Sequence, residues 1–292
     1  MIRLDPATLT AIGDLEIAAR MLVDGFMFGG HPSRMQGAGI EFSQYRNYQP
    51  GDDLRRVDWK LFARSDRYFV RESEAETSVT IRIVLDASDS MREEEDGVSK
   101  FACARLLAAA LAMIAFRQGD AVGLTAVSQG GARAWRADRG RSHLNRLLLA
   151  LSAIEPGGSW PDWHRLEGPL LAAPAREIVI AITDLNERGN EIRAALEKLS
   201  ALRHDVRVLH LVGRREMTFD YDPAVTFEEL ETGRTLDVAT GAVRERYLAS
   251  LSAALRNIDL ELGEHRIGCH RIRTDQPLDE ALREALSARS RR

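Results

Sequence analysis

Apolar runs rich in β-branched residues alternate with segments of helical periodicity from about residue 77 onward, and this alternation restricts the fold more than any other feature. Continuous apolar strands separated by helices indicate a mostly parallel sheet that is buried on both faces. We therefore predict an α/β fold with a doubly wound, mostly parallel sheet. The predicted strands are 79–85, 120–127, 133–136, 177–183, 206–212 and 267–273, and the predicted helices are 101–116, 143–154, 191–202, 243–262 and 278–289.

An amphipathic helix is predicted near the start of the chain. Asp5 is a typical N-cap residue, and Pro6 fits the first helical turn, where its missing N–H costs nothing. Apolar residues then recur at steps of three and four, which places them on one face of a helix. They are Ile12, Leu15, Ala19, Leu22 and Phe26. The pair Gly29-Gly30 is expected to end this helix.

Residues 31–76 depart from these regular patterns. They mix glycine, proline and short aromatic stretches, so we expect short strands and loops that pack beside the main domain. The predicted organisation therefore has two parts. Residues 1–76 form the N-terminal helix and an irregular β-containing subdomain, and residues 77–292 form the main domain, with a hairpin insertion at about 214–240.

The overall composition argues against several classes of protein. The formal charge is −4, from 40 Lys and Arg against 44 Asp and Glu, so a nucleic-acid partner is not expected. Residues 31–72 hold eight Lys and Arg against six Asp and Glu, a balance that favours internal ion pairs over phosphate contacts. Two cysteines, Cys103 and Cys269, are too few for a disulfide framework or a four-ligand zinc site, which favours a reduced, cytoplasmic protein.

No membrane insertion is expected from the sequence. The longest apolar run, 106–116, covers eleven residues, whereas a helix needs about 20 to cross a bilayer. The first residues of the chain include acids where a signal peptide would be apolar. We therefore expect a protein without a membrane anchor.

Oxygen-bearing side chains follow two of the predicted strands. The first strand runs into Asp86-Ala87-Ser88-Asp89-Ser90, and the strand 177–183 ends at Thr183-Asp184. In an open parallel sheet a ligand binds outside the carboxyl ends of the strands, where the strand order reverses. A glycine-rich loop at Ser159 offers one more hydroxyl. Hydroxyls and carboxylates without histidine or cysteine suit Mg²⁺ or Mn²⁺ rather than zinc. The predicted metal ligands are Asp86, Ser88, Ser90, Ser159 and Asp184.

Each of these signals has a simpler structural interpretation. Aspartate and serine after a strand are common as turn residues and helix caps, and Ser159 is placed to cap a following helix. The acidic run Glu93-Glu94-Glu95-Asp96 could indicate calcium. Adjacent side chains point in divergent directions, however, so a solvated loop rim is favoured.

The predicted ligands resemble the metal-ion-dependent adhesion site of von Willebrand factor type A domains. In that family a D-x-S-x-S segment follows the first strand, a threonine lies in a glycine-rich loop, and an aspartate follows the fourth strand. Here the segment is matched by Asp86, Ser88 and Ser90, the threonine by Ser159, and the final aspartate by Asp184. The resemblance implies a von Willebrand A-like domain of Rossmann-type topology. If the chain is a metal-dependent interaction module, one coordination position of the ion would stay open for an acidic side chain of a partner.

A second resemblance comes from an ordered set of short motifs ahead of this domain. They are Gly37-x-Gly39-x-Glu41-Phe42, Tyr45-Arg46-x-Tyr48-x-Pro50-Gly51-Asp52-Asp53-x-Arg55, Asp58-Trp59-Lys60-x-x-Ala63-Arg64 and Val70-Arg71-Glu72. Their order is similar to that in the bacterial domain-of-unknown-function fifty-eight family, whose members carry this block directly before a von Willebrand A-like domain. The resemblance implies action with a MoxR-type AAA+ ATPase in chaperone-like maturation or assembly of other proteins.

Three functional classes are compatible with these observations. The first is a metal-ion-dependent protein-interaction module, whose partner is the MoxR-type ATPase, a client protein that supplies an acidic residue, or both. The second is a Mg²⁺-dependent hydrolase or phosphoryl-transfer enzyme, and the third is a scaffold with an unoccupied metal site. Catalysis is disfavoured, and no catalytic residue is assigned. A haloacid-dehalogenase-type phosphatase would carry a second aspartate where Ser88 stands, and no G-x-x-x-x-G-K-[ST] phosphate loop occurs.

Overall fold

The computed structural model of the chain describes residues 4–28, 44–47, 59–65, 67–72, 79–170, 176–228 and 234–287. The chain divides into two compact units, of which the larger comprises Met1–Ser33 with Val79–Arg292 and the smaller Arg34–Ser78. The N-terminal helices therefore belong to the unit that holds the sheet, whereas the sequence patterns grouped them with the rest of residues 1–76.

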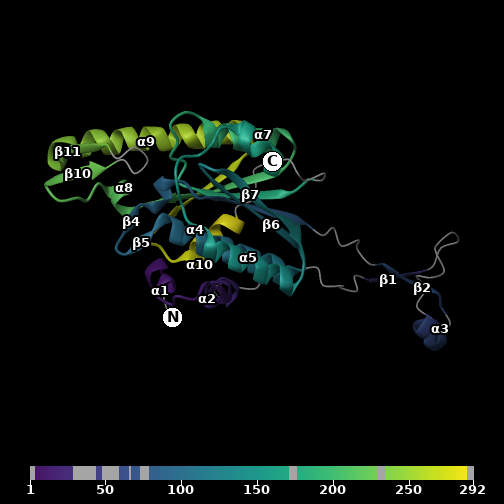
Figure 1. The fold of residues 1–292 in the computed structure, drawn as a ribbon. Coiled ribbons are helices and arrows are strands. Elements are labelled where there is room, and N and C mark those ends of the chain that lie inside the picture. Colours follow the sequence, from purple (N-terminus) through teal and green to yellow (C-terminus); the bar gives the residue numbers. More distant parts are fainter. Residues whose placement is uncertain are drawn as a thin grey trace. The chain divides into compact units, whose positions relative to one another are not determined.

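A six-stranded sheet forms the centre of the larger unit (Figure 1). Its strands are β3 (Thr80–Asp86), β6 (Ala121–Ser128), β7 (Gly131–Asp138), β8 (Ile178–Thr183), β9 (Asp205–Val212) and β12 (Gly268–Arg273). They lie in the order β12-β9-β8-β3-β6-β7, and all neighbours are parallel except β6 and β7, which a tight turn connects. The chain enters the middle of the sheet and builds one side and then the other. The predicted doubly wound, mostly parallel sheet is thus confirmed.

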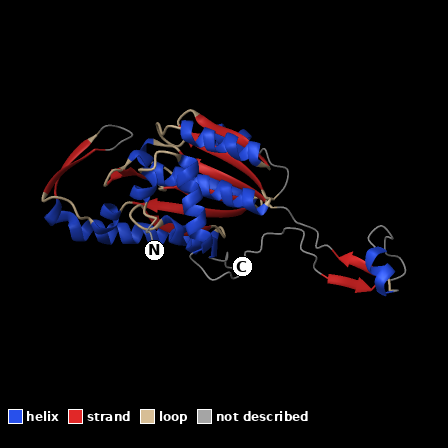
Figure 2. Cartoon of the chain, turned by 90° about the horizontal axis from the view of Figure 1, so that it is seen from below, coloured by secondary structure: helices blue, strands red, loops and turns tan. Residues whose placement is uncertain are grey.

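Helices cover both faces of this sheet (Figures 1 and 2). α4 (Lys100–Gln118), α5 (Arg141–Ala153) and α10 (Leu278–Ser287) pack on one face, and α6 (Trp163–Leu170), α7 (Glu191–Ala201) and α9 (Thr240–Glu264) on the other. Alternate residues of β3 join the two cores, Ile83 and Leu85 on one side and Val84 on the other. The strands read as continuous apolar runs because both of their faces are buried.

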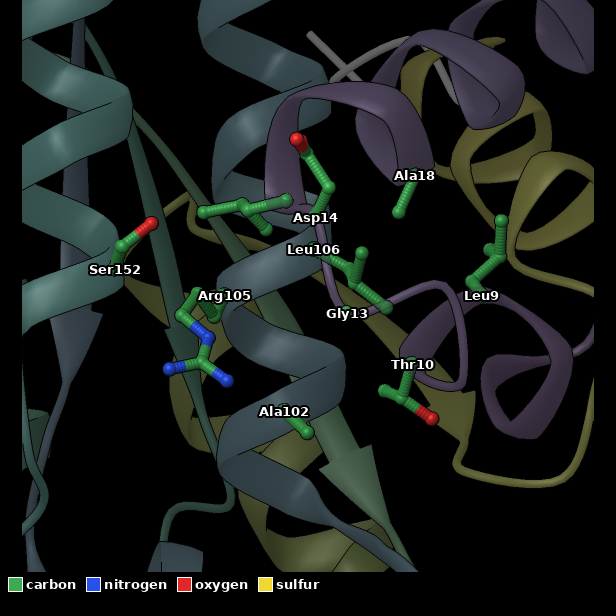
Figure 3. A pocket seen from close by; sticks show the side chains of 10 residues that line it. Leu9, Thr10, Gly13, Asp14, Ala18, Ala102, Arg105, Leu106 and Ser152 are labelled. Carbon is green, nitrogen blue, oxygen red and sulfur yellow. The ribbon is translucent and has the colours of Figure 1, made fainter.

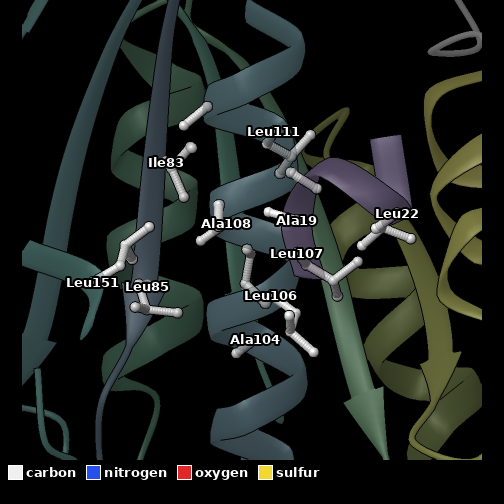
Figure 4. Close-up of a cluster of buried hydrophobic side chains, with 14 of the residues drawn as sticks. Ala19, Leu22, Ile83, Leu85, Ala104, Leu106, Leu107, Ala108, Leu111 and Leu151 are labelled. Carbon is white, nitrogen blue, oxygen red and sulfur yellow. The ribbon is translucent and has the colours of Figure 1, made fainter. Parts of the chain in front are cut away.

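α2 (Leu15–Phe28) adds a third layer on the outer side of α4. Figure 4 shows α4 between two apolar surfaces, with Ile83 and Leu85 of β3 on one side and Ala19 and Leu22 of α2 on the other. A helix that is apolar on every side is typically buried on every side. Most residues of α4 are apolar and buried, so α4 is a helix of this kind. Among the described residues, α4 is the one helix long and apolar enough to cross a membrane, and most of it lies inside this core.

The predicted single N-terminal helix is wrong, because the structure divides it in two. α1 (Pro6–Thr10) begins at the predicted N-cap, where Oδ1 of Asp5 accepts a hydrogen bond from a backbone N–H of the helix (2.7 Å). The chain then turns at Gly13, whose φ is +73°, and Asp14 caps the start of α2 in the same way (3.0 Å). The apolar spacing did not reveal this break because residues on both sides of it face the same core.

A cavity of about 240 Å³ lies where this turn meets α4 and α5 (Figure 3). Thr10 and Asp14 line it from the N-terminal helices, and Arg105 and Ser152 line it from α4 and α5. Leu9, Leu15 and Leu106 also line it, so the lining is mixed.

An antiparallel hairpin lies within the predicted insertion at 214–240. After β9, α8 (Arg214–Thr218) leads to β10 (Ala224–Glu228) and β11 (Thr235–Ala239), and α9 follows directly. The long helix α9 therefore begins where the insertion ends, and it returns the chain to the sheet.

The acidic run forms part of a second, smaller hairpin, in which Glu94 and Asp96 are exposed as expected of a solvated rim, whereas Glu93 and Glu95 pair with basic residues. Its strands are β4 (Glu94–Glu95) and β5 (Val98–Ser99). Oε2 of Glu95 accepts a hydrogen bond from the N–H of Arg215 in α8 (3.1 Å), and its Oε1 lies 3.0 Å from the guanidinium of Arg214. These contacts attach the small hairpin to the start of the insertion.

The smaller unit is described in three pieces, which are β1 (Gln44–Asn47), α3 (Trp59–Ser65) and β2 (Phe69–Glu72). β1 and β2 pair as antiparallel strands, and Phe62 of α3 stacks on Tyr68 with ring centroids 4.4 Å apart. The motif residues from 37 to 42 and from 48 to 58 lie outside the described residues, as do Gly29 and Gly30.

Candidate metal centre

The reversal of strand order between β3 and β8 brings two strand ends together. β3 ends at Asp86, and its parallel neighbour β8 ends at Thr183, so that Asp184 follows at the same edge of the sheet. Oδ2 of Asp86 accepts a hydrogen bond from Oγ1 of Thr183 (2.6 Å), although the two residues are 97 positions apart. This edge is where an open α/β sheet binds its ligands.

The turn after β3 brings two serine hydroxyls to the same place. Oδ1 of Asp86 accepts a hydrogen bond from the N–H of Ser88 (2.9 Å), and the chain continues as a short 3₁₀ helix, Asp89–Arg92. Oγ of Ser88 lies 3.0 Å from Oγ of Ser90, which donates to Oδ1 of Asp184 (3.1 Å). Four of the five predicted ligands are therefore close together, and all four are buried.

The fifth predicted ligand, Ser159, lies on a loop that is attached to the same turn. The N–H of Gly157 donates to the backbone of the turn (2.8 Å), and Gly158 exchanges two hydrogen bonds with Asp89 (2.7 and 2.6 Å). Gly158 has a φ of +67°, and a Cβ at this position would collide with the side chain of Gln129. Ser159 is half-buried and forms no hydrogen bond with the other four ligands in the described part of the chain. Its role as a ligand stays a prediction.

Lys100, which is not among the residues predicted from the sequence, lies beside these ligands. It is the first residue of α4, and its side chain is 5% exposed. Its Nζ lies 3.4 Å from Oδ2 of Asp184 and 2.6 Å from one carboxylate oxygen each of Glu93 and Glu216. A signal was present in the sequence, because Lys100 is one of only three lysines among 40 basic residues and follows the acidic run closely.

Burial raises the pKa of both aspartates. For Asp86, burial and then the charge of Asp184 raise the pKa to about 7, against the hydrogen bonds from Thr183 and Ser88. Burial also raises the pKa of Asp184, although Lys100 opposes it. Among the described residues, neither oxygen of Asp86 contacts a cationic side chain. Asp86 is thus a buried carboxylate without a cation.

Lys100 faces more carboxylates than it can neutralise. Burial lowers the pKa of its ammonium, but Asp184, Glu216 and Glu93 outweigh burial and raise it. Burial raises the pKa of Glu93 to about 7, with Lys100 opposing this effect. Burial acts in the same direction on Glu216, yet Lys100 and hydrogen bonds hold the pKa of Glu216 below its ordinary value. Three carboxylates thus share one ammonium and Asp86 has none, so the site carries surplus negative charge when these four groups are ionised.

The donor set fits a small divalent cation. Two carboxylates and two hydroxyls are hard oxygen ligands of the kind that Mg²⁺ and Mn²⁺ prefer. A dication would also offset the surplus negative charge, which Lys100 alone does not. Within the described ranges, no three His, Cys, Asp or Glu side chains form a metal-ligating group, so no zinc-type set competes with these oxygens.

Comparison with known proteins identifies the family. The family model for "Protein of unknown function DUF58" matches residues 44–256. The chain belongs to the DUF58 family. The uncharacterized protein Rv1480 of Mycobacterium tuberculosis (strain ATCC 25618 / H37Rv) is 29% identical to this DUF58 chain over 235 residues, which cover 78% of the chain and 73% of the relative. The uncharacterized protein Mb1516 of Mycobacterium bovis matches to the same extent. The family predicted from the ordered motifs is confirmed.

Solved structures similar to the DUF58 chain have low sequence identity. BatB from Bacteroides thetaiotaomicron has a TM-score of 0.44 and 17% identity, and the match covers 72% of this chain and 98% of that one. The VWA domain of SpRpn10 has a TM-score of 0.41 and 9% identity, with 70% and 94% covered. An aerotolerance-related membrane protein from Bacteroides fragilis NCTC 9343 has a TM-score of 0.44 and 18% identity, with 72% and 98% covered.

Proposed function

We propose that this DUF58 chain is a metal-ion-dependent protein-interaction module. It holds Mg²⁺ or Mn²⁺ at the edge between β3 and β8 and binds an acidic side chain of a partner there. The observation that carries the proposal is the convergence of four buried oxygen-bearing side chains with surplus negative charge: Asp86, Ser88, Ser90 and Asp184. The bound ion supplies a positive centre for a carboxylate from outside the chain.

The surrounding residues position these ligands before binding. Thr183 and the backbone of Ser88 fix the two oxygens of Asp86, while Ser90 and Lys100 fix those of Asp184. Preorganised donors bind an ion at a lower entropic cost than mobile ones. A carboxylate about 4 Å from one unit of positive charge gains about 4 kcal/mol at an effective dielectric constant near 20, and desolvation offsets part of this gain. One such contact decides whether a modest interface forms.

The partner is proposed from the family resemblance. It is a MoxR-type AAA+ ATPase, or a client protein that supplies the acidic residue, in chaperone-like maturation or assembly of other proteins. Membership of the DUF58 family supports this assignment.

Calorimetric titration of Mg²⁺ and Mn²⁺ into the full chain tests metal binding. We expect saturable heat with the wild type and none with Asp86→Asn. Asp138→Asn is the matched control, because Asp138 is an exposed aspartate on β7 at the far edge of the sheet. A wild-type chain that gives neither heat nor a thermal shift with either metal contradicts the proposal.

Binding of a purified MoxR-type ATPase from the same genome tests the partner. The ATPase needs Mg²⁺ for its own nucleotide, so the comparison is made at constant Mg²⁺ between the wild type and Asp86→Asn. Loss of binding in the variant supports the proposal, and equal binding contradicts it. Turnover of nitrophenyl phosphate or ATP by the DUF58 chain alone, if abolished by Asp86→Asn, would favour the hydrolase alternative.

A further inference from the structure

A second pocket lies beside the candidate metal centre. Residues of α8, α9 and the hairpin β10–β11 line an open cavity of about 460 Å³. Figure 1 shows where these elements lie. Its volume falls within the range of about 300–1,000 Å³ that is usual for ligand pockets. The lining combines aliphatic side chains with aromatic rings and carboxylates, and the rings and carboxylates are those of Phe219, Tyr221, Phe227, Tyr247, Glu93 and Glu216. None of them is a proposed metal ligand.

Four aromatic rings from separate elements contact one another in the wall of this pocket. The centroid of Phe219 lies 4.4 Å from that of Tyr247 and 5.3 Å from that of Tyr221. Tyr221 in turn meets Phe227 edge to face at 5.0 Å. Phe219 follows α8 in the left-handed region (φ +50°), and its side chain is buried at the centre of the group. These mutual contacts hold the rings in place, so the aromatic wall is preformed.

Two carboxylates give the pocket its charge. Glu93 and Glu216 both bind Nζ of Lys100 at 2.6 Å, and Asp184 approaches the same ammonium, so three carboxylates share one cation. The side chains of Glu93 and Glu216 are 39% and 26% exposed, which leaves both accessible from the cavity. Their charge also acts on the aromatic wall, because burial and then Glu93 raise the pKa of Tyr221 to about 12.

We propose that this pocket binds a basic side chain, arginine or lysine, of a partner polypeptide. Ring faces and carboxylates both attract a guanidinium or ammonium group. An apolar side chain would bury Glu93 and Glu216 without adding positive charge, although their ammonium partner Lys100 also faces Asp184, and an acidic side chain would be repelled by them. Arg246 also lines the pocket but is exposed on α9, and among the described residues it forms no ion pair with either glutamate. In the described part of the chain, Lys100 is therefore the cation that pairs with these two carboxylates, and it serves Asp184 as well.

The pocket and the candidate metal centre meet at Lys100, whose Nζ contacts Glu216 on one side and Asp184 on the other. A partner segment that binds the metal through an acidic residue can place a neighbouring basic residue in the pocket. This two-point binding rests on the proposed function. The basic site itself does not require the metal.

Fluorine NMR of the full chain labelled with 3-fluorotyrosine tests the proposal in the presence of EDTA. The chain has five tyrosines, and single Tyr→Phe variants assign the resonances of Tyr221 and Tyr247. The probes are capped peptides of sequence Gly-Ser-X-Ser-Gly, in which X is arginine, lysine, norleucine or glutamate. We expect the arginine and lysine peptides to shift these two resonances saturably and to leave the other three unchanged.

Two variants locate the binding. Phe227→Leu removes one ring and Glu93→Gln removes one charge, and each is expected to weaken binding of the arginine peptide about fivefold. Glu228→Gln is the control, because Glu228 is the next residue of β10 and is exposed. If the peptide-free spectrum shows that Phe227→Leu disturbs the hairpin, the result with Glu93→Gln alone tests whether the arginine peptide binds in the pocket.

Three outcomes overturn the proposal. They are equal binding of the norleucine peptide, preferential binding of the glutamate peptide, and no shift of Tyr221 or Tyr247 with any peptide. Because EDTA is present throughout, failure here is distinct from failure of metal binding, which calorimetry measures separately.

Discussion

Nζ of Lys100 lies 3.4 Å from Oδ2 of Asp184, so the chain places its own cation beside the proposed metal ligands. The same ammonium binds Glu93 and Glu216. This internal cation reduces the repulsion among buried carboxylates when no metal is bound, and it repels a dication that binds next to it. Lys100 therefore has opposite effects on the stability of the metal-free chain and on metal affinity.

Replacing Lys100 by methionine separates these two effects. The metal-free variant is expected to lose about 2–4 kcal/mol of stability, because buried carboxylates lose their counter-charge. Its affinity for Mg²⁺ is expected to rise, and Mg²⁺ should increase its melting temperature more than that of the wild type. Thermal unfolding with EDTA and with Mg²⁺ measures both. Lys198→Met, at an exposed position on α7, is the matched control. Unchanged metal affinity in Lys100→Met would show that the ammonium does not act on the ion.

Asp86→Asn is expected to abolish metal-dependent partner binding while the fold remains intact. In EDTA the variant should be more stable than the wild type by about 1–3 kcal/mol, because it removes a buried charge that faces Asp184 without changing the size of the side chain. Urea unfolding in EDTA measures the difference. A less stable variant would mean that the charge of Asp86 is satisfied without a metal.

Gly158→Ala tests whether the loop that carries Ser159 belongs to the site. A Cβ at this glycine would lie 2.2 Å from Cβ of Gln129. The alanine would also have to keep the left-handed backbone conformation of Gly158. We expect a loss of about 2 kcal/mol in urea unfolding and weaker metal binding in calorimetry. The neighbouring Gly157→Ala is the control, because nothing lies within 4 Å of its Cβ. If Gly158→Ala reduces stability but leaves metal affinity unchanged, the prediction that Ser159 is a ligand is wrong.

The stability of the chain is expected to fall in mild acid because of His210. Its Nε2 lies 3.1 Å from the backbone carbonyl of Asp184, and its Nδ1 is buried without a partner in the described part of the chain. Burial, with help from Arg271, lowers the pKa of His210 to about 4. The unfolded chain therefore binds this proton more readily than the folded chain. The contribution of His210 is complete above about pH 6.5 and is lost as the pH falls toward 4, by about 3 kcal/mol in total.

Urea unfolding at several pH values between 7.5 and 4.5 measures this effect. His210→Gln should have a flatter pH dependence than the wild type, whereas His164→Gln, at an exposed position on α6, should retain the wild-type slope. Equal slopes for the wild type and His210→Gln would assign the acid sensitivity to other groups.

The central sheet could be predicted from sequence because its strands are buried on both faces and read as uninterrupted apolar runs. The edge strand β7 was predicted too short, at 133–136, because its exposed positions carry polar residues that break the run. The helix α6 was missed, since it is short and contains Pro169. The break between α1 and α2 was missed for a different reason, because the core lies on the same side of both helices.

The residues of the candidate site also differ in how far the sequence predicts their positions. Asp86 and Asp184 could be predicted as neighbours because each directly follows a strand, and parallel strands end at one edge. Glu216 could not be placed there from its sequence position. It reaches Lys100 only because α8 folds over the start of α4, and this contact depends on tertiary packing that no local pattern encodes.

The packing of α2 on α4 has a practical consequence for shortened versions of the protein. A fragment that starts at residue 77 would keep the whole sheet, yet it would expose to water the flank of α4 that Ala19 and Leu22 cover. Apolar patches of this kind promote aggregation. Measurements of binding should therefore use protein in which the first 28 residues are retained, although the whole of the smaller unit separates them from the sheet in sequence.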